Sequence, residues 1–167
     1  MRTHRAGARI PATPEGTSQM PLLRAEDAES IKKEFAEHLQ ADVTVTLVGP
    51  SALNPPARDL TRQIRELYGE VAALSPHVKV EYLDLPTPEQ RAALGLQPGE
   101  GGPLTVISGA GKGRVRFVGG PLGYEFGSFI RCLVDVARGD SGLSAESREK
   151  LAKVATPVHI KVFFTPT

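Results

Sequence analysis

The sequence predicts an α/β domain with a mixed central sheet flanked by helices. Three observations support this fold class: a strand–helix–strand unit over residues 41–85, two strand segments around a glycine-rich turn at 104–118, and an amphipathic helix at 126–137. A strand–helix–strand unit implies two parallel strands joined by a right-handed crossover, whereas a hairpin adds antiparallel strands. The 167 residues, of which 40% are hydrophobic, are enough for one such core.

Residues 1–21 are predicted to be a disordered leader. Arg2, Arg5 and Arg9 lie among Gly, Pro and Thr, and such a segment buries too little surface to offset its ordering entropy. A basic arm or a targeting peptide is the alternative. Met20 is a candidate for the true start, because the sequence becomes typical of a folded chain just after it.

The first half of the predicted domain alternates helices and strands. A helix over Ala25–Leu39 precedes a strand over Ala41–Val48, and a helix over Ala57–Leu74 precedes a strand over Val78–Leu85. The second helix has the strongest apolar stripe, and the first strand alternates valine or leucine with threonine. The connection at 49–56 is rich in Gly, Pro, Ser and Asn and is predicted to be a loop.

The second half begins with a short helix over Pro88–Leu94, which ends at Gly95. A loop at 97–102 then leads to strands over Leu104–Ser108 and Arg114–Val118. The separation of these two strands favours a hairpin.

The last predicted elements are two helices and a strand. The first helix covers Phe126–Ala137 and is followed by Gly139, where a glycine can end a helix in the left-handed conformation. Ser144 can cap a helix that extends to about Val154. An apolar strand over Val158–Phe164 completes the chain. From 41 to 137 this is the order of elements in a thioredoxin fold, with an additional helix before it.

One segment carries a specific family resemblance. Residues 119–126 read Gly-Gly-Pro-Leu-Gly-Tyr-Glu-Phe, with further similarity at 135–144 and 70–75. From about Met20 to its end, the chain resembles the glutaredoxin-like protein disulfide oxidoreductases. It is also similar to the N-terminal domain of the alkyl hydroperoxide reductase flavoprotein subunit. The resemblance implies two adjacent thioredoxin folds, of which residues 22–140 form the first. Residues 141–167 would then be a linker helix and the first strand of a truncated second fold.

The resemblance places the family's reactive cysteines where this chain has none. The family's Cys-Pro-x-Cys would follow the strand Val158–Phe164, beyond Thr167. In the first fold the two cysteine positions fall at Ser51 and Asn54, or at Asp59 and Arg62, depending on the gap placement. Disulfide exchange needs an attacking thiolate and a second thiol to resolve the mixed disulfide. Since Cys132 is the only cysteine, the chain alone lacks that pair.

Two candidate sites remain. Gly102, Pro103 and Leu104 open the third strand, where the resemblance implies a cis-proline and a loop that pairs with an extended protein partner. The alternative is that Pro103 only shapes the turn. Cys132, within the helix at 126–137, is either a reactive thiol or a small apolar core residue.

Other candidate residues favour structural roles. The glycine-rich segment 109–113 resembles a phosphate loop but lacks a following helix, so a hairpin turn is predicted. Asp59 and Glu125 are expected to be helix-capping or first-turn carboxylates, and Glu125 could also bond the loop backbone. The four histidines lack metal-ligand spacing backed by further ligands, so no metal site is expected. We expect no cofactor either.

We expect a redox-inactive module that serves as a scaffold or docking domain for a protein partner in a thiol–disulfide or peroxide-reduction system. The alternative is half of a protein disulfide oxidoreductase whose Cys-Pro-x-Cys lies in a missing domain. A net charge of +1 gives no reason to expect nucleic acid, and no apolar run reaches the length of a membrane span. We expect a cytoplasmic protein. The strand 158–164 either covers the chain's own sheet edge or is exchanged in a homodimer.

Overall fold

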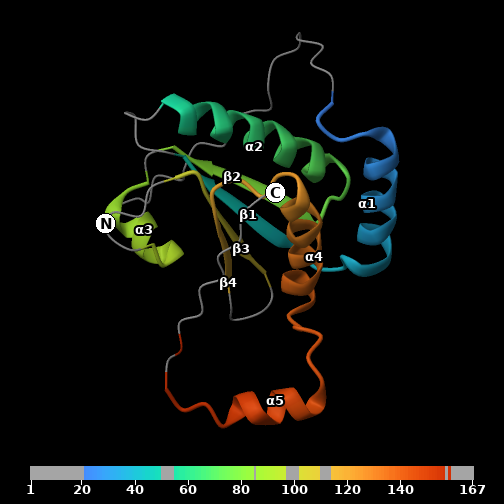
Figure 1. Cartoon of the computed structure of the whole chain (residues 1–167), viewed down its shortest axis with the longest axis vertical. Helices are drawn as coiled ribbons and strands as arrows, with labels where there is room; N and C mark the ends of the chain where they lie inside the picture. The colour runs from blue at the N-terminus through green and yellow to red at the C-terminus, as the bar shows by residue number, and fades with distance from the viewer. Residues whose placement is uncertain are drawn as a thin grey trace, which may run out of the picture.

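The computed structural model of the chain describes residues 21–49, 55–84, 86–96, 102–109, 114–156 and 158. Figure 1 shows the helices and strands along the chain. Their bounds are α1 Ala25–His38, β1 Val43–Val48, α2 Pro55–Ala73, β2 Val78–Leu83, α3 Pro88–Leu94, β3 Leu104–Ser108, β4 Arg114–Val118, α4 Tyr124–Arg138 and α5 Ala145–Ala152. The predicted order of elements is therefore confirmed as far as α5.

The strands form a mixed sheet in the order β2-β1-β3-β4. β1 and β2 are parallel, as the crossover rule requires, and β3 is antiparallel to both β1 and β4. The register aligns Leu83, Val48, Leu104 and Val118 in one row across the sheet. This row marks the end of the sheet at which β1, β2 and β4 finish and β3 begins.

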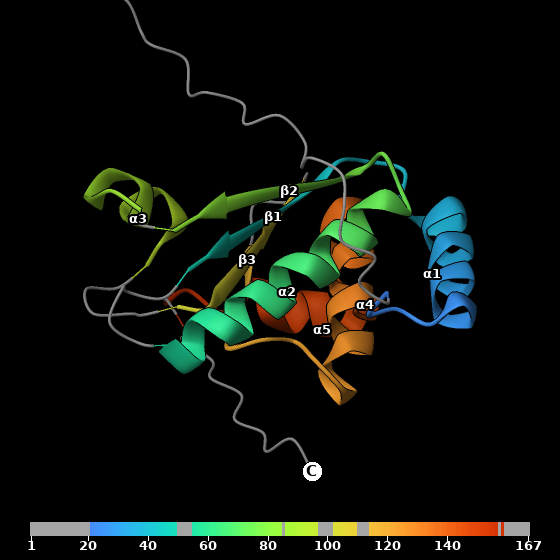
Figure 2. The same ribbon diagram turned by 90° about the horizontal axis from the view of Figure 1, so that it is seen from above.

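One face of the sheet carries the main core. Helices α1, α2 and α4 cover this face, and Figure 2 shows α3 apart from them. Phe129 is central, because its ring stacks on Tyr68 at 4.8 Å and lies 6.1 Å from the rings of both Phe117 and Phe126. The hydroxyl of Tyr68 shares a hydrogen bond of 2.7 Å with Thr105, which satisfies both buried oxygens.

The opposite face of the sheet has a smaller apolar cluster. Val48, Leu104, Val106 and Leu96 are buried there, and Leu94 of α3 packs against them. Two arginines of β4 hold α3 in place: Arg114 donates to the carbonyl of Ala93 and Arg116 to that of Gly95. Cations are favourable at this end of a helix because its last carbonyls carry partial negative charge. Helices thus lie on both faces, as predicted.

The ends of several elements follow from individual residues. Thr87 caps α3 with a capping box, and Gly95 ends it with a φ of 69°. Gly139 ends α4 with a φ of 65°, and Ser144 accepts the N–H of Ser147 at the start of α5, as predicted. The leader up to residue 20, the turn at 110–113 and all of the expected strand 158–164 except Val158 lie outside the described residues. Val158 itself is not in a strand.

Candidate functional site

The candidate site lies at the end of the sheet defined by the row Leu83, Val48, Leu104 and Val118. The N–H of Gly49 donates to the carbonyl of Leu83 at 2.9 Å, which extends the pairing of β1 and β2 by one residue. The N–H of Gly119 donates to the carbonyl of Pro103 at 2.9 Å. The second bond brings the segment that follows β4 to the residue that precedes β3, and the first keeps Gly49 aligned with the end of β2.

Gly102 lies directly on the backbone at the end of β1. A Cβ added to Gly102 would be 2.3 Å from the carbonyl oxygen of Gly49 and 2.5 Å from that of Val48. No real side chain tolerates such contacts with backbone atoms, so the position requires glycine. The peptide bond between Gly102 and Pro103 is cis, the conformation that the resemblance implies.

The three predicted partner-binding residues differ in accessibility. Gly102 is half-buried and Pro103 is buried. The side chain of Leu104 is only 1% exposed and packs in the smaller apolar cluster. Within the described residues, neither the N–H nor the C=O of Gly102 takes part in a hydrogen bond. Any direct contact with a partner would therefore come from the backbone of Gly102, while Leu104 anchors the strand beneath it.

The loop that carries the Gly-Gly-Pro-Leu-Gly motif closes the site against α2. A Cβ at Gly120 would lie 2.7 Å from the Cδ1 atom of Ile64, so the loop approaches α2 closely here. Glu125 lies in the first turn of α4, as predicted, and burial raises the pKa of its carboxyl group. The expected bond from Glu125 to the loop backbone is not among the interactions of the described residues.

The start of α2 contains no sulfur atom. Ser51 and Asn54 lie outside the described residues. Asp59 and Arg62 are both exposed and form an ion pair of 3.1 Å with each other. α2 begins at Pro55, two residues earlier than predicted, so Asp59 falls in its second turn and the first turn contains no acidic residue. The expectation of a first-turn carboxylate at Asp59 was therefore wrong, because proline is tolerated at the start of a helix.

Cys132 is half-buried in α4 and packs against the main core. Burial raises the pKa of its thiol, and the nearby Asp135 carboxylate adds to this effect. A thiol with a raised pKa is mostly protonated at neutral pH, and the thiolate is the nucleophile. These surroundings agree better with a small core residue than with a reactive thiol.

Two polar interactions were not predicted from the sequence. The carboxylate of Glu70 accepts the N–H groups of Leu22 and Leu23, at 2.9 and 2.8 Å, and so attaches the segment before α1 to α2. His77 Nδ1 lies 2.9 Å from the carboxylate of Asp42, and this hydrogen bond lowers the pKa of Asp42. The second pair could have been found, because Asp42 and His77 each precede one of two adjacent parallel strands.

Among the described residues, no group of three His, Cys, Asp or Glu side chains is placed to hold a metal ion. Within the same residues, no helix is long and apolar enough to cross a membrane.

Comparison with known proteins identifies the fold. No family profile and no curated protein sequence matches the chain. Its structure is similar to the NTD_N/C domain of the alkyl hydroperoxide reductase AhpF from Enterococcus faecalis, with a TM-score of 0.60 and 17% identity over 77% of this chain and 59% of that one. The chain has a thioredoxin-like fold.

Two further solved structures share this thioredoxin-like fold. The AhpF subunit of E. faecalis matches with a TM-score of 0.60 and 20% identity over 81% of this chain and 61% of that one. A protein disulfide oxidoreductase from Aeropyrum pernix K1 matches with a TM-score of 0.57 and 17% identity over 78% of this chain and 55% of that one. The chain thus spans less than two thirds of the length of each of these proteins.

Proposed function

We propose that this thioredoxin-like domain is a redox-inactive module that docks an extended segment of a protein partner in a thiol–disulfide or peroxide-reduction system. The observation that carries the proposal is the backbone of Gly102, which is unpaired in the described part of the chain. Its backbone lies against Val48 and Gly49, is half-buried, and makes no hydrogen bond within the described residues. An N–H and a C=O in this state can pair with an added strand.

Two further observations support docking without chemistry. The sequence at the start of α2 has no cysteine, and Cys132 lies in α4 with a raised thiol pKa. Val118, at the β4 end of the same row as Leu104, is 79% exposed and offers an apolar contact beside Gly102. The reacting groups of a disulfide oxidoreductase are therefore missing from a site that retains a surface for a peptide. A reducing compartment such as the cytoplasm suits such a module.

The docking is tested with a peptide that cannot react. We suggest the S-carboxymethylated insulin B chain as the probe, titrated into the ¹⁵N-labelled chain and followed by NMR. The expected result is a saturable shift of the amide signals of Gly102 and Gly119, with Val118→Glu weakening the binding. Lys79→Glu is the matched control and should leave binding unchanged. Lys79 lies on the same face of the sheet as Val118, but in β2 and four residues away from the row that contains Val118. No saturable shift at Gly102, or equal effects of the two substitutions, would contradict the proposal.

The coverage of the neighbours supports a second candidate function. The chain spans 55% of the A. pernix disulfide oxidoreductase, so it can be half of such an enzyme whose other half supplies Cys-Pro-x-Cys. The DNA immediately downstream of the codon for Thr167 tests this candidate. An in-frame Cys-Pro-x-Cys favours it, and a stop codon without such a motif nearby removes it.

A further inference from the structure

Large apolar side chains are exposed mainly in two places on the described part of the molecule. One is the arm, which we define as residues 141–156 and Val158, where Leu143, Leu151, Val154 and Val158 are between 41% and 66% exposed. The other is the region around Leu22 and Tyr124, which are 49% and 83% exposed. Val118, beside Gly102, is the remaining exposed large apolar residue. Of these residues, Leu151 and Val154 are adjacent, because the N–H of Val154 donates to the carbonyl of Leu151 at 3.0 Å. Exposed apolar side chains that lie together mark interaction sites more often than scattered ones do.

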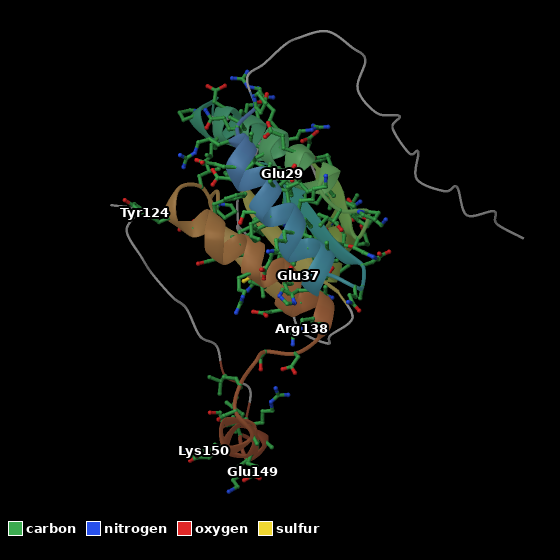
Figure 3. All side chains as sticks on the ribbon, turned by 90° about the vertical axis from the view of Figure 1, so that its right-hand side faces the viewer. Glu29, Glu37, Tyr124, Arg138, Glu149 and Lys150 are labelled. Carbon is green, nitrogen blue, oxygen red and sulfur yellow. The ribbon has the colours of Figure 1, made fainter. Side chains whose placement is uncertain are left out.

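Leu22 belongs to a hollow of about 330 Å³. Its apolar walls are Leu22, Leu23, Leu67, Leu122 and Phe126, which come from the segment before α1, from α2 and from the start of α4. The Glu70 carboxylate holds the first of these segments in place through the N–H groups of Leu22 and Leu23. Tyr124 follows Gly123, which also lines the hollow, and Figure 3 shows its side chain projecting from the start of α4. The hollow is at the lower end of the size range of binding pockets.

Polar contacts within residues 140–148 attach α5 to the segment that connects it to α4. Arg148 of α5 lies 2.6 Å from the Asp140 carboxylate and donates to the carbonyl of Leu143 at 2.8 Å. None of the residues of α5 is buried, and Figures 1 and 3 both show the helix standing clear of the rest of the fold. An isolated helix of two turns is not stable in water on its own. The arm therefore exposes an apolar surface that has no cover within the described residues.

The arm and the hollow of one chain lie at opposite ends of α4. The arm begins three residues after Arg138, the last residue of α4, whereas Leu122, Gly123 and Phe126 of the hollow surround its first residue. The 15 residues of α4 separate these ends by about 22 Å. Figure 1 shows α5 at the bottom of the molecule and the start of α4 in its upper part. The arm of another copy has access to this hollow, whereas α5 of the same chain does not reach it.

We infer that the chain forms a two-fold homodimer in which the arm of each copy lies in the hollow of the other. Two copies related by a two-fold axis and placed antiparallel along α4 form both contacts at once, so the assembly closes. Each contact removes Leu151 and Val154 of one copy and Leu22 and Tyr124 of the other from water. This dimer uses a different surface from Gly102 and does not rest on the proposed function.

The oligomeric state tests the inference. Sedimentation velocity over a concentration series should show the full chain approaching twice the monomer mass and no further. Leu151→Lys in the arm and Leu22→Lys at the hollow should each give monomers whose far-UV circular dichroism differs from that of the dimer by no more than the helicity of the eight residues of α5. Ala152→Lys, at an exposed position next to Leu151, is the matched control and should leave the dimer intact. A full chain that remains monomeric at its solubility limit, oligomers that grow beyond two copies, or loss of the dimer in only one of the two lysine variants would overturn the inference.

Cross-linking tests whether the arm meets the hollow of the other copy. Two variants are made in a Cys132→Ser background, one with Tyr124→Cys and one with Leu151→Cys, and are mixed with a short bis-maleimide. A linked product that contains one chain of each variant is expected. Glu37→Cys in place of Tyr124→Cys should abolish it, because Glu37 is exposed in the last turn of α1 (Figure 3), ten residues after Asp27, which lines the hollow. Equal yields with Glu37→Cys and Tyr124→Cys would contradict the proposed contact.

Discussion

Replacing Gly102 by alanine inserts a methyl group into the contact between the start of β3 and the end of β1. The new Cβ would lie 2.3 Å from the carbonyl oxygen of Gly49 and 2.5 Å from that of Val48. Both atoms belong to the backbone, and Gly49 is fixed by its hydrogen bond to Leu83. The contact can be relieved only if one strand end moves away from the other.

This movement lowers the free energy of unfolding. Overpacking a well-packed site costs about 1–3 kcal/mol, and Gly102→Ala is expected at about 3 kcal/mol because the atoms that the new methyl group meets belong to the backbone. For a chain of this length, each 1 kcal/mol changes the unfolding temperature by about 2–4 °C, so the expected decrease is about 6–12 °C.

Urea unfolding followed by circular dichroism measures this change, and the chain contains its own controls. A Cβ at Gly69 in α2 or at Gly127 in α4 would meet no atom within 4 Å. Alanine at either helical position should instead stabilise the chain by up to about 1 kcal/mol, since glycine loses more conformational entropy on folding. The assigned packing of Gly102 is wrong if the urea midpoint of Gly102→Ala equals that of the parent chain. It is also wrong if this midpoint equals those of the single variants Gly69→Ala and Gly127→Ala.

Three further predictions concern other parts of the fold. Tyr68→Phe leaves the buried hydroxyl of Thr105 without its partner, and urea unfolding should show a loss of about 1–3 kcal/mol; a change within error would contradict the buried hydrogen bond. Because burial raises the pKa of Cys132, an aromatic disulfide reagent should label the folded chain more slowly than the unfolded chain at the same pH, and equal rates would contradict this. The lowered pKa of Asp42 stabilises the fold above the ordinary carboxyl pKa, and this stabilisation is lost as the pH falls. His77→Ala should therefore raise the Asp42 pKa in an NMR titration, and an unchanged value would remove His77 as its main cause.

The sequence was most informative where local chemistry sets the boundaries. The bounds of α3 were predicted without error, because proline opens this helix, Gln90 completes its capping box with Thr87, and Gly95 ends it. β3 and β4 were also predicted without error. The start of α2 was placed two residues too late, because Pro55 and Pro56 are typical of a loop but also fit the first turn of a helix.

The sequence was least informative where the deciding contact is distant along the chain. Gly102 was singled out as a binding residue, but its contact with Val48 and Gly49 depends on the pairing of β1 with β3. Leu104 was predicted to contact a partner, although the strand alternation places its side chain in the core. Glu70 resembles any charged residue on a helix surface, since its two partners are backbone groups 47 and 48 residues away.

The central claim is that this thioredoxin-like fold docks a partner without redox chemistry. The most direct test is the reduction of insulin by dithiothreitol, followed as turbidity. The chain is added at a concentration at which a Cys-x-x-Cys thioredoxin clearly shortens the lag before turbidity appears. We predict that the lag and the rate of turbidity stay equal to those with dithiothreitol alone. The Cys132→Ser variant should give the same trace. A clear acceleration by the chain would contradict the account, and its loss in Cys132→Ser would identify Cys132, the only thiol of the chain, as the reacting group.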